Sequence, residues 1–269
     1  MSTILDTGHH CVVAGVRLPF NFAPAGSGLP IVLLHGLTDS QRSFDGVFER
    51  LAGQHPLLAP TYRGHGEADR PAGDYHPTDL AADVRGMLDV LDIPRAVVVG
   101  HSLGAAVAHR LAVTAPERVA GLVLVGAFAP PATNTAVPEL QTMVATLPDP
   151  VPSVAAEEFQ RATVATFVPE SYMETVIAES LKVPARVWRA ATEAFAGSDP
   201  LEGLSAVRVP TRLVWGDQDA FVPRADQERL LEALPTAQLS IYEGVGHAVH
   251  WEQPHRFSAD LRAFARAIG

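Results

Sequence analysis

The chain has 269 residues, of which 47% are hydrophobic and 19% are charged. This balance is typical of a folded globular protein and excludes long disordered spans. The formal net charge of -10 repels nucleic acids and anionic lipids, and no basic patch in the sequence offsets it. We therefore expect a small-molecule substrate, no nucleic-acid partner and no stable membrane association, with the oligomeric state left open.

Two residue types are nearly absent, and each absence removes a class of chemistry. Lys182 is the only lysine, which excludes a P-loop and leaves one Schiff-base candidate in a segment with no other catalytic residues. Cys11 is the only cysteine, so no intrachain disulfide can form.

Residues 1–19 lack a signal-peptide pattern, and the longest apolar run, 119–129, is about half of the ~20 residues that span a bilayer. We expect a soluble, cytoplasmic protein.

Short apolar segments rich in β-branched residues recur along the chain and predict strands. They show no polar alternation, so both faces of each strand should be covered, as in a parallel sheet. The predicted strands are residues 31–34, 57–60, 96–99, 122–125, 212–215 and 239–242.

Longer segments with a helical repeat alternate with these strands. One apolar stripe runs through residues 80–91, with Thr78 as the expected N-cap, and another runs through 257–268 after Pro254. Both stripes predict helices that pack on the sheet, and together with the strands they indicate an α/β fold.

The segment 130–204 breaks this alternation. It is rich in proline and predicts helices near 155–167, 171–181 and 185–196, with no convincing strand. An all-helical insertion of this kind favours a cap, or lid, over the carboxyl edge of the sheet, where open α/β folds bind ligands. We expect a core of residues 1–129 and 205–269 and a helical cap of residues 130–204.

The sequence Gly100-His101-Ser102-Leu103-Gly104 joins the predicted strand 96–99 to a helical run. This G-x-S-x-G pattern in a strand-turn-helix context predicts a nucleophile elbow, in which glycines permit a tight turn that lifts the serine hydroxyl above the sheet. A serine between glycines could also serve only as a helix cap. The context favours Ser102 as a nucleophile.

With this motif, His35-Gly36 after the first predicted strand makes the chain resemble the α/β-hydrolase superfamily, in particular its serine esterases and lipases. The resemblance implies a mostly parallel central sheet flanked by helices, with the lid inserted after the sixth strand. It also implies that the backbone amides of Leu37 and Leu103 form an oxyanion hole, while His35 holds the loop.

Arg63-Gly64-His65-Gly66 resembles a turn that recurs in these hydrolases, although Glu67 stands where the family often has serine. Its glycines explain the turn structurally, and Arg63 is expected to form an ion pair. We assign this turn no chemical role.

The acid of a catalytic triad is expected from Trp215-Gly216-Asp217-Gln218-Asp219, directly after a buried strand. Resemblance to the family's G-x-x-D pattern favours Asp219 over Asp217, which fits a turn residue with local hydrogen bonds. The acid position that some relatives use, after strand 122–125, holds Gly126 and Ala127 and offers no carboxylate.

The base is expected from Gly244-Val245-Gly246-His247, which matches the family's G-x-G-H ending before the final helix. His250 is the nearest rival, and Trp251 beside it suggests a packing role. The 11 histidines also raise the question of a metal, but the close pairs lack a metalloprotease spacing and have no cysteine cluster. We expect neither metal nor cofactor.

The resemblance implies an acyl-enzyme hydrolase, with Ser102 as nucleophile, His247 as base and Asp219 as acid. The residues that we expect to contact the substrate are apolar, which predicts an uncharged, moderately hydrophobic ester, lactone or thioester. Cofactor-free perhydrolysis, carbon-carbon cleavage by the same triad, and small-molecule sensing with a vestigial triad remain alternatives. Ser102 disfavours dehalogenases and epoxide hydrolases, whose families place aspartate there. The expected contacts are Phe128, Val222, Val249 and Trp188, with Phe159 and Phe167 above the site.

Overall fold

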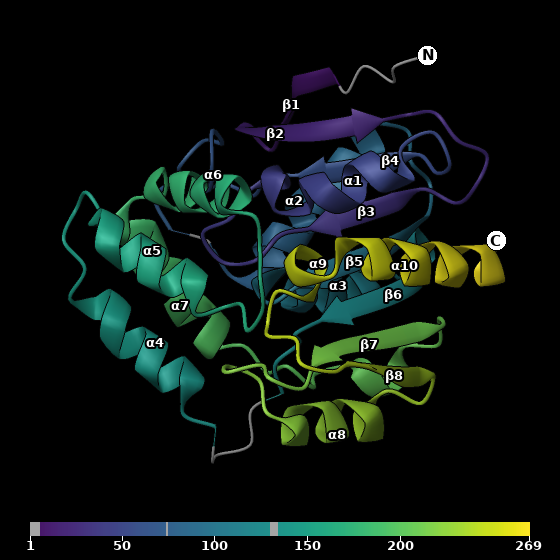
Figure 1. Ribbon diagram of the computed structural model, residues 1–269. Helices are drawn as coiled ribbons and strands as arrows, with labels where there is room; N and C mark the ends of the chain where they lie inside the picture. Colours follow the sequence, from purple (N-terminus) through teal and green to yellow (C-terminus); the bar gives the residue numbers. More distant parts are fainter. Residues whose placement is uncertain (1–5, 74, 130–133) are drawn as a thin grey trace.

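The computed structural model describes residues 6–73, 75–129 and 134–269, which build an eight-stranded sheet (Figure 1). The strand order is β1-β2-β4-β3-β5-β6-β7-β8, antiparallel from β1 to β4 and parallel from β4 to β8. The strands are β1 (Asp6–Val13), β2 (Val16–Ala23), β3 (Ile31–Leu34), β4 (Leu57–Pro60), β5 (Ala96–His101), β6 (Val119–Val125), β7 (Thr211–Gly216) and β8 (Ala237–Tyr242).

The central strands are buried on both faces, which confirms the expectation of a covered parallel sheet. Every residue of β3, β5 and β6 is buried. Side chains alternate between the faces: Val32 and Leu34 join one hydrophobic cluster, whereas Ile31 and Leu33 join the other. The core is thus two apolar layers separated by the sheet.

Helices cover each face. The first layer includes α2 (Pro77–Val90), α3 (Leu103–Thr114) and α8 (Arg224–Ala233), and the second α1 (Asp45–Leu51), α9 (Val249–Glu252) and α10 (Pro254–Ile268). The predicted stripes are therefore core faces. The N-cap of α2 is His76 rather than Thr78, because Pro77 occupies the first helical position and His76 Nδ1 accepts a 3.2 Å bond from the Thr78 amide.

In the described residues between β6 and β7, the α-helices are α4 (Ala136–Ala145), α5 (Ser153–Arg161), α6 (Glu170–Leu181) and α7 (Ala185–Ala196). In Figure 1 they stack at the left, beyond the arrowheads of β3 and β6. The sequence predicted α6 and α7 well, placed the end of α5 too late and missed α4. Pro138 lies in the first turn of α4, where its missing amide breaks no helical bond. Residues 130–133 of the expected cap lie outside the described residues.

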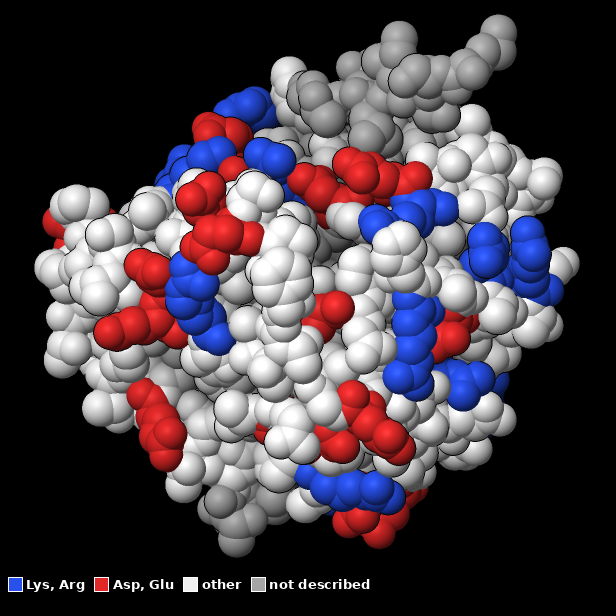
Figure 2. Space-filling model, in the orientation of Figure 1, with Lys and Arg blue, Asp and Glu red and all other residues white. Residues whose placement is uncertain are grey.

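Acidic and basic side chains are interspersed over the face seen in Figure 2. Lys182 pairs with Glu67 at 3.0 Å and with Glu179 at 2.8 Å. As expected, Arg63 forms an ion pair: its guanidinium makes two short bonds to the buried Asp83. None of the helices in the described parts of the chain has the length and apolar character to cross a bilayer.

Candidate active site

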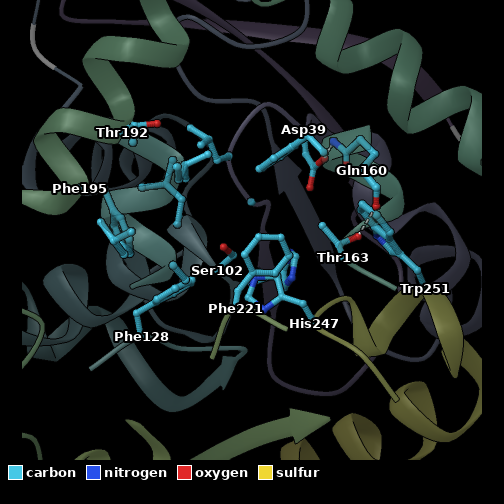
Figure 3. A pocket seen from close by; sticks show the side chains of 18 residues that line it. Asp39, Ser102, Phe128, Gln160, Thr163, Thr192, Phe195, Phe221, His247 and Trp251 are labelled. Atoms are coloured by element: carbon cyan, nitrogen blue, oxygen red, sulfur yellow. Dashed lines mark hydrogen bonds between the residues drawn. The ribbon is translucent and has the colours of Figure 1, made fainter. Parts of the chain in front are cut away.

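A pocket opens between the carboxyl edge of the sheet and the inserted helices, as Figure 3 shows from close by. It holds about 610 Å³ of space not filled by atoms, its open mouth included. Its larger apolar lining residues are Leu37, Leu103, Phe128, Val137, Leu140, Phe159, Phe195, Phe221 and Trp251. Its polar lining residues are Asp39, His101, Ser102, Gln160, Thr163, Thr192 and His247. The described lining thus contains no lysine or arginine.

Ser102 stands at a sharp turn between the last residue of β5 and the first of α3. Its backbone has φ +55° and ψ -117°, a conformation that costs a non-glycine residue about 1–3 kcal/mol. The Ser102 amide donates a 2.9 Å bond to the carbonyl of Val125, and the Ser102 carbonyl accepts a 2.8 Å bond from Ala105. These bonds hold the strained turn, and the hydroxyl faces the pocket (Figure 3).

The flanking glycines are required for close packing rather than for positive φ, which falls on Ser102 itself. A Cβ added to Gly100 would lie 2.0 Å from the carbonyl oxygen of Gly104. A Cβ at Gly104 would lie 2.2 Å from the carbonyl oxygen of Leu34. The two glycines therefore let the start of α3 pass directly against β5 and β3.

The predicted base and acid meet at the pocket floor. His247 Nδ1 lies 2.8 Å from Asp219 Oδ2, and both side chains are buried. The other carboxylate oxygen, Oδ1, accepts bonds of 2.8 Å and 3.0 Å from the amides of Phe221 and Val222. In the tautomer that donates from Nδ1 to this carboxylate, Nε2 carries no proton and can act as an acceptor.

The two rival residues lie elsewhere. Asp217 is exposed and accepts a 2.6 Å bond from the Gly244 amide. His250 Nε2 lies 3.2 Å from Ser43 Oγ, and its ring stacks on Phe44 at 4.3 Å. Within the described residues, neither forms a hydrogen bond with His247 or Asp219, so the geometry favours the residues that the motifs selected.

Gly126 explains where the imidazole fits. A Cβ at this position would lie 2.7 Å from Nδ1 and from Cε1 of His247, and Gly126 has φ +54°. The sequence indicated only that Gly126 is no acid. That Gly126 also leaves space for His247 depends on tertiary packing, which no local motif encodes.

Ser102 and His247 line the same pocket, but no hydrogen bond joins their side chains within the described structure. In free hydrolases this contact is often long and shortens when substrate binds. The structure thus places the predicted nucleophile and the predicted base in one pocket, without a hydrogen bond between their side chains.

Leu37 and Leu103, whose amides were predicted to form the oxyanion hole, both line the pocket. Neither amide donates to another group in the described residues. Leu103 is the first residue of α3, so its amide belongs to the positive end of that helix. His35 holds the opposite loop: Nδ1 lies 2.8 Å from the Gly36 carbonyl oxygen, and Nε2 accepts a 3.1 Å bond from the Tyr62 amide.

Buried ionisable groups surround the site. Burial, with His250 and His247 nearby, holds the pKa of His101 well below its usual range, and burial lowers the pKa of His250 to about 3. Both rings are therefore neutral at physiological pH. Burial raises the pKa of Asp39 to about 7, although hydrogen bonds oppose the shift.

The expected substrate contacts need correction. Phe128 lines the pocket and meets His247 edge to face at 5.7 Å. Val222, Val249 and Trp188 are fully buried behind the lining, where Trp188 supports Phe159 at 5.2 Å. Phe159 itself lines the pocket. Phe167 is 81% exposed and lies outside the lining. The sequence shows that these residues are apolar but not how far they lie from the pocket, so residues buried behind the lining could not be distinguished from the lining itself.

Several lining residues were not anticipated. Asp39 stands two residues after Leu37, and its position in that loop could have suggested a place near the site. Gln160, Thr192 and Phe195 come from the inserted helices, where no motif marks them. Within the described residues, no three histidine, cysteine, aspartate or glutamate side chains are grouped so that they could hold a metal.

Comparisons with known proteins agree with this architecture. Residues 31–260 match a family model described as Alpha/beta hydrolase family. An uncharacterized protein of Mycobacterium tuberculosis is 30% identical over 268 residues, covering 91% of this chain and 77% of that protein. A non-heme chloroperoxidase of Streptomyces lividans is 29% identical over 264 residues, covering 89% and 92%. An esterase structure from a Rhodococcus species has a TM-score of 0.84 and 26% identity, covering 98% and 100%. The chain belongs to the alpha/beta hydrolase family.

Proposed function

We propose that the protein is a serine hydrolase that cleaves a carboxylic ester, lactone or thioester through an acyl-enzyme. The observation that carries this proposal is the buried 2.8 Å contact between His247 and Asp219 in the pocket that also contains Ser102 at a strained turn. Strain that persists at such a turn is typical of functional sites.

In the proposed reaction, Ser102 Oγ attacks the substrate carbonyl carbon while His247 Nε2 removes its proton. The amides of Leu37 and Leu103 stabilise the oxyanion, and Asp219 stabilises the imidazolium. His247 then gives the proton to the leaving alkoxide, which departs as an alcohol. A water molecule, deprotonated by the same imidazole, attacks the acyl-enzyme and releases the acid and free Ser102.

The pocket lining supports a small, uncharged and moderately hydrophobic substrate. Phe128, Phe159 and Phe195 supply apolar surface, and the described lining offers no cation to pair with an anionic group. We further propose that the inserted helices act as the cap of residues 130–204, over a core of residues 1–129 and 205–269.

The test compares the wild type with Ser102→Ala on p-nitrophenyl acetate and butyrate. We expect kcat to fall on the order of 10³- to 10⁶-fold while circular dichroism stays unchanged. A fluorophosphonate probe should label the wild type at Ser102 and leave the variant unlabelled. Retained turnover in the variant would refute the proposal, and slow single-turnover hydrolysis by the wild type would favour a sensing role.

A second candidate is perhydrolysis, which the 29% identity to a chloroperoxidase favours. The same acyl-enzyme would then be attacked by hydrogen peroxide instead of water, giving a peracid and free Ser102. Acetate with peroxide should produce peracetic acid in the wild type and none in Ser102→Ala. A ratio of perhydrolysis to hydrolysis no higher than that of an unrelated esterase would exclude this candidate as the main activity.

A further inference from the structure

A buried carboxylate faces the proposed acyl site from the loop after β3. Asp39 is only 2% exposed, lines the pocket and points into it (Figure 3). It stands two residues after Leu37, whose amide is the proposed oxyanion donor. A group that Asp39 binds would therefore lie close to the scissile carbonyl.

Two side chains orient this carboxylate. Gln160 Nε2 on α5 donates a 2.9 Å bond to Oδ1, and Ser43 Oγ donates a 3.1 Å bond to Oδ2. Both donors are fixed in turn: Gln160 Nε2 lies 2.6 Å from Ser180 Oγ on α6, and Ser43 Oγ lies 3.2 Å from His250 Nε2. Asp39 is thus held in one geometry before any ligand arrives.

The carboxylate still has capacity for another donor. An ionised carboxylate has about four acceptor positions. Gln160 and Ser43 fill two, and the Gly36 backbone provides at most one more. No lysine or arginine in the described lining neutralises the charge. At least one acceptor position therefore has no donor among the described residues, on a side chain that points into the pocket.

A purely structural role would not require an acid. An asparagine at this position could accept the bond from Gln160 and reach Ser43 without placing a charge in an apolar wall, which is costly. Polar groups in apolar pockets give specificity, because a ligand that leaves them unpaired binds poorly. The choice of a carboxylate therefore indicates a hydrogen-bond donor on the ligand.

We propose that Asp39 is a specificity-determining residue that accepts a hydrogen bond from a hydroxyl or N–H group a few bonds from the scissile carbonyl. The substrate class is accordingly a hydroxy- or acylamino-substituted ester or lactone. This inference rests on the proposed function, because it locates the carbonyl by Ser102 and the Leu37 amide.

The test measures kcat/KM at pH 8 for ethyl butyrate and for its 2-hydroxy and 3-hydroxy derivatives, each beside the methyl ether of that hydroxyl. A second series places the hydroxyl on the alcohol side, in 2-hydroxyethyl butyrate. The wild type should prefer at least one hydroxyl substrate over its methyl ether by at least roughly tenfold, as expected for a bond to a charged group.

Asp39→Asn should remove most of that preference, because kcat/KM should fall more for the hydroxyl substrate than for its methyl ether or for ethyl butyrate. Thr192→Val, which removes another polar group from the same pocket, is the matched control and should keep the preference. An equal loss on all substrates in Asp39→Asn would overturn the proposal and show that Asp39 positions the loop of Leu37.

The wild-type comparison requires no variant, so it decides the question even where Asp39→Asn does not fold. Absence of any hydroxyl preference in the wild type would overturn the proposal for Asp39. Failure of the proposed function looks different, since hydrolysis of ethyl butyrate would then persist in Ser102→Ala. Serine-dependent hydrolysis without a hydroxyl preference would refute the Asp39 proposal alone.

Discussion

Gly126 leaves the space in which the His247 imidazole lies, since a Cβ there would approach the ring to 2.7 Å. The glycine comes directly after β6, and the imidazole comes from the loop that follows β8. The Gly126 amide donates a 3.0 Å bond to the carbonyl of Val214 in β7, which holds Gly126 at the carboxyl edge of the sheet. The orientation of the proposed base thus depends on a residue with no side chain.

Gly126→Ala should displace the imidazole and lower kcat/KM for a p-nitrophenyl ester by at least roughly 100-fold, because catalysis is sensitive to displacements of about 1 Å. Positive φ at this position adds strain to the clash. Steady-state kinetics beside a thermal melt would separate lost activity from lost folding. Unchanged kinetics would contradict the packing account.

Asp219→Asn should lower kcat on the order of 10⁴-fold, because the amide cannot hold the imidazole tautomer that leaves Nε2 basic. Asp217→Asn is the matched control two residues away. The Asp217 side chain is exposed and, among the described residues, accepts bonds from Gly244 and Gln218, so its variant should keep kcat within a few-fold. The reverse result in the same ester assay would transfer the role of acid to Asp217.

Asp39→Asn should change how stability depends on pH. In the folded protein the Asp39 pKa is raised to about 7 from an ordinary value of 3.8, because the carboxyl is buried. Below pH 3.8 both states hold the proton, and between 3.8 and 7 only the folded state keeps it. The free energy of unfolding therefore falls as the pH rises through this range, by up to about 4 kcal/mol from this group.

Urea unfolding of the wild type and Asp39→Asn at several pH values between 4 and 9 measures this effect. The stability of the variant relative to the wild type should rise up to about pH 7 and then level off. The buried histidines act in the opposite direction, since their lowered pKa values remove stability as the pH falls below 6.5, but both proteins share them. A difference independent of pH would contradict the raised pKa.

Gly104→Ala should destabilise the fold by roughly 3 kcal/mol or more, because the new Cβ would meet the backbone oxygens of Leu34 and His35 at 2.2 Å and 2.6 Å. Gly197→Ala offers a control, since its Cβ finds only ordinary contacts of 3.4 Å and 3.8 Å. Chemical denaturation of both variants tests this, and equal midpoints would contradict the role assigned to Gly104.

Much of the core was predictable because local sequence determines it. Strands β3 and β4 have the predicted bounds, since continuous apolar runs ending in polar or glycine residues are distinctive in a parallel sheet. The elbow at Ser102 and the loops of Asp219 and His247 carry short motifs. These residues meet because each follows the carboxyl end of a parallel strand, and such ends lie along one edge.

The pocket wall was less predictable because it depends on contacts between distant segments. Gln160 and Asp39 are 121 positions apart and belong to no common pattern. Val249 and Trp188 have the same apolar character as the true lining, but their depth is set by neighbours that the sequence does not identify. Helix α4 was missed because Pro138 resembles a break although it lies in the first turn.

The buried polar side chains beneath α5 and α6 restrict the route by which a substrate enters the pocket. Gln160 and Ser180 connect these two helices to Thr38 and Asp39, whereas α4 packs on α7 and contributes the apolar Val137 and Leu140 to the wall. Movement of α5 away from this loop would break the bonds from Gln160 Nε2 to Asp39 Oδ1 and Thr38 Oγ1, which lie next to Leu37 in the sequence. Separation of α4 from α7 would instead widen the entrance of the pocket without moving the Leu37 amide.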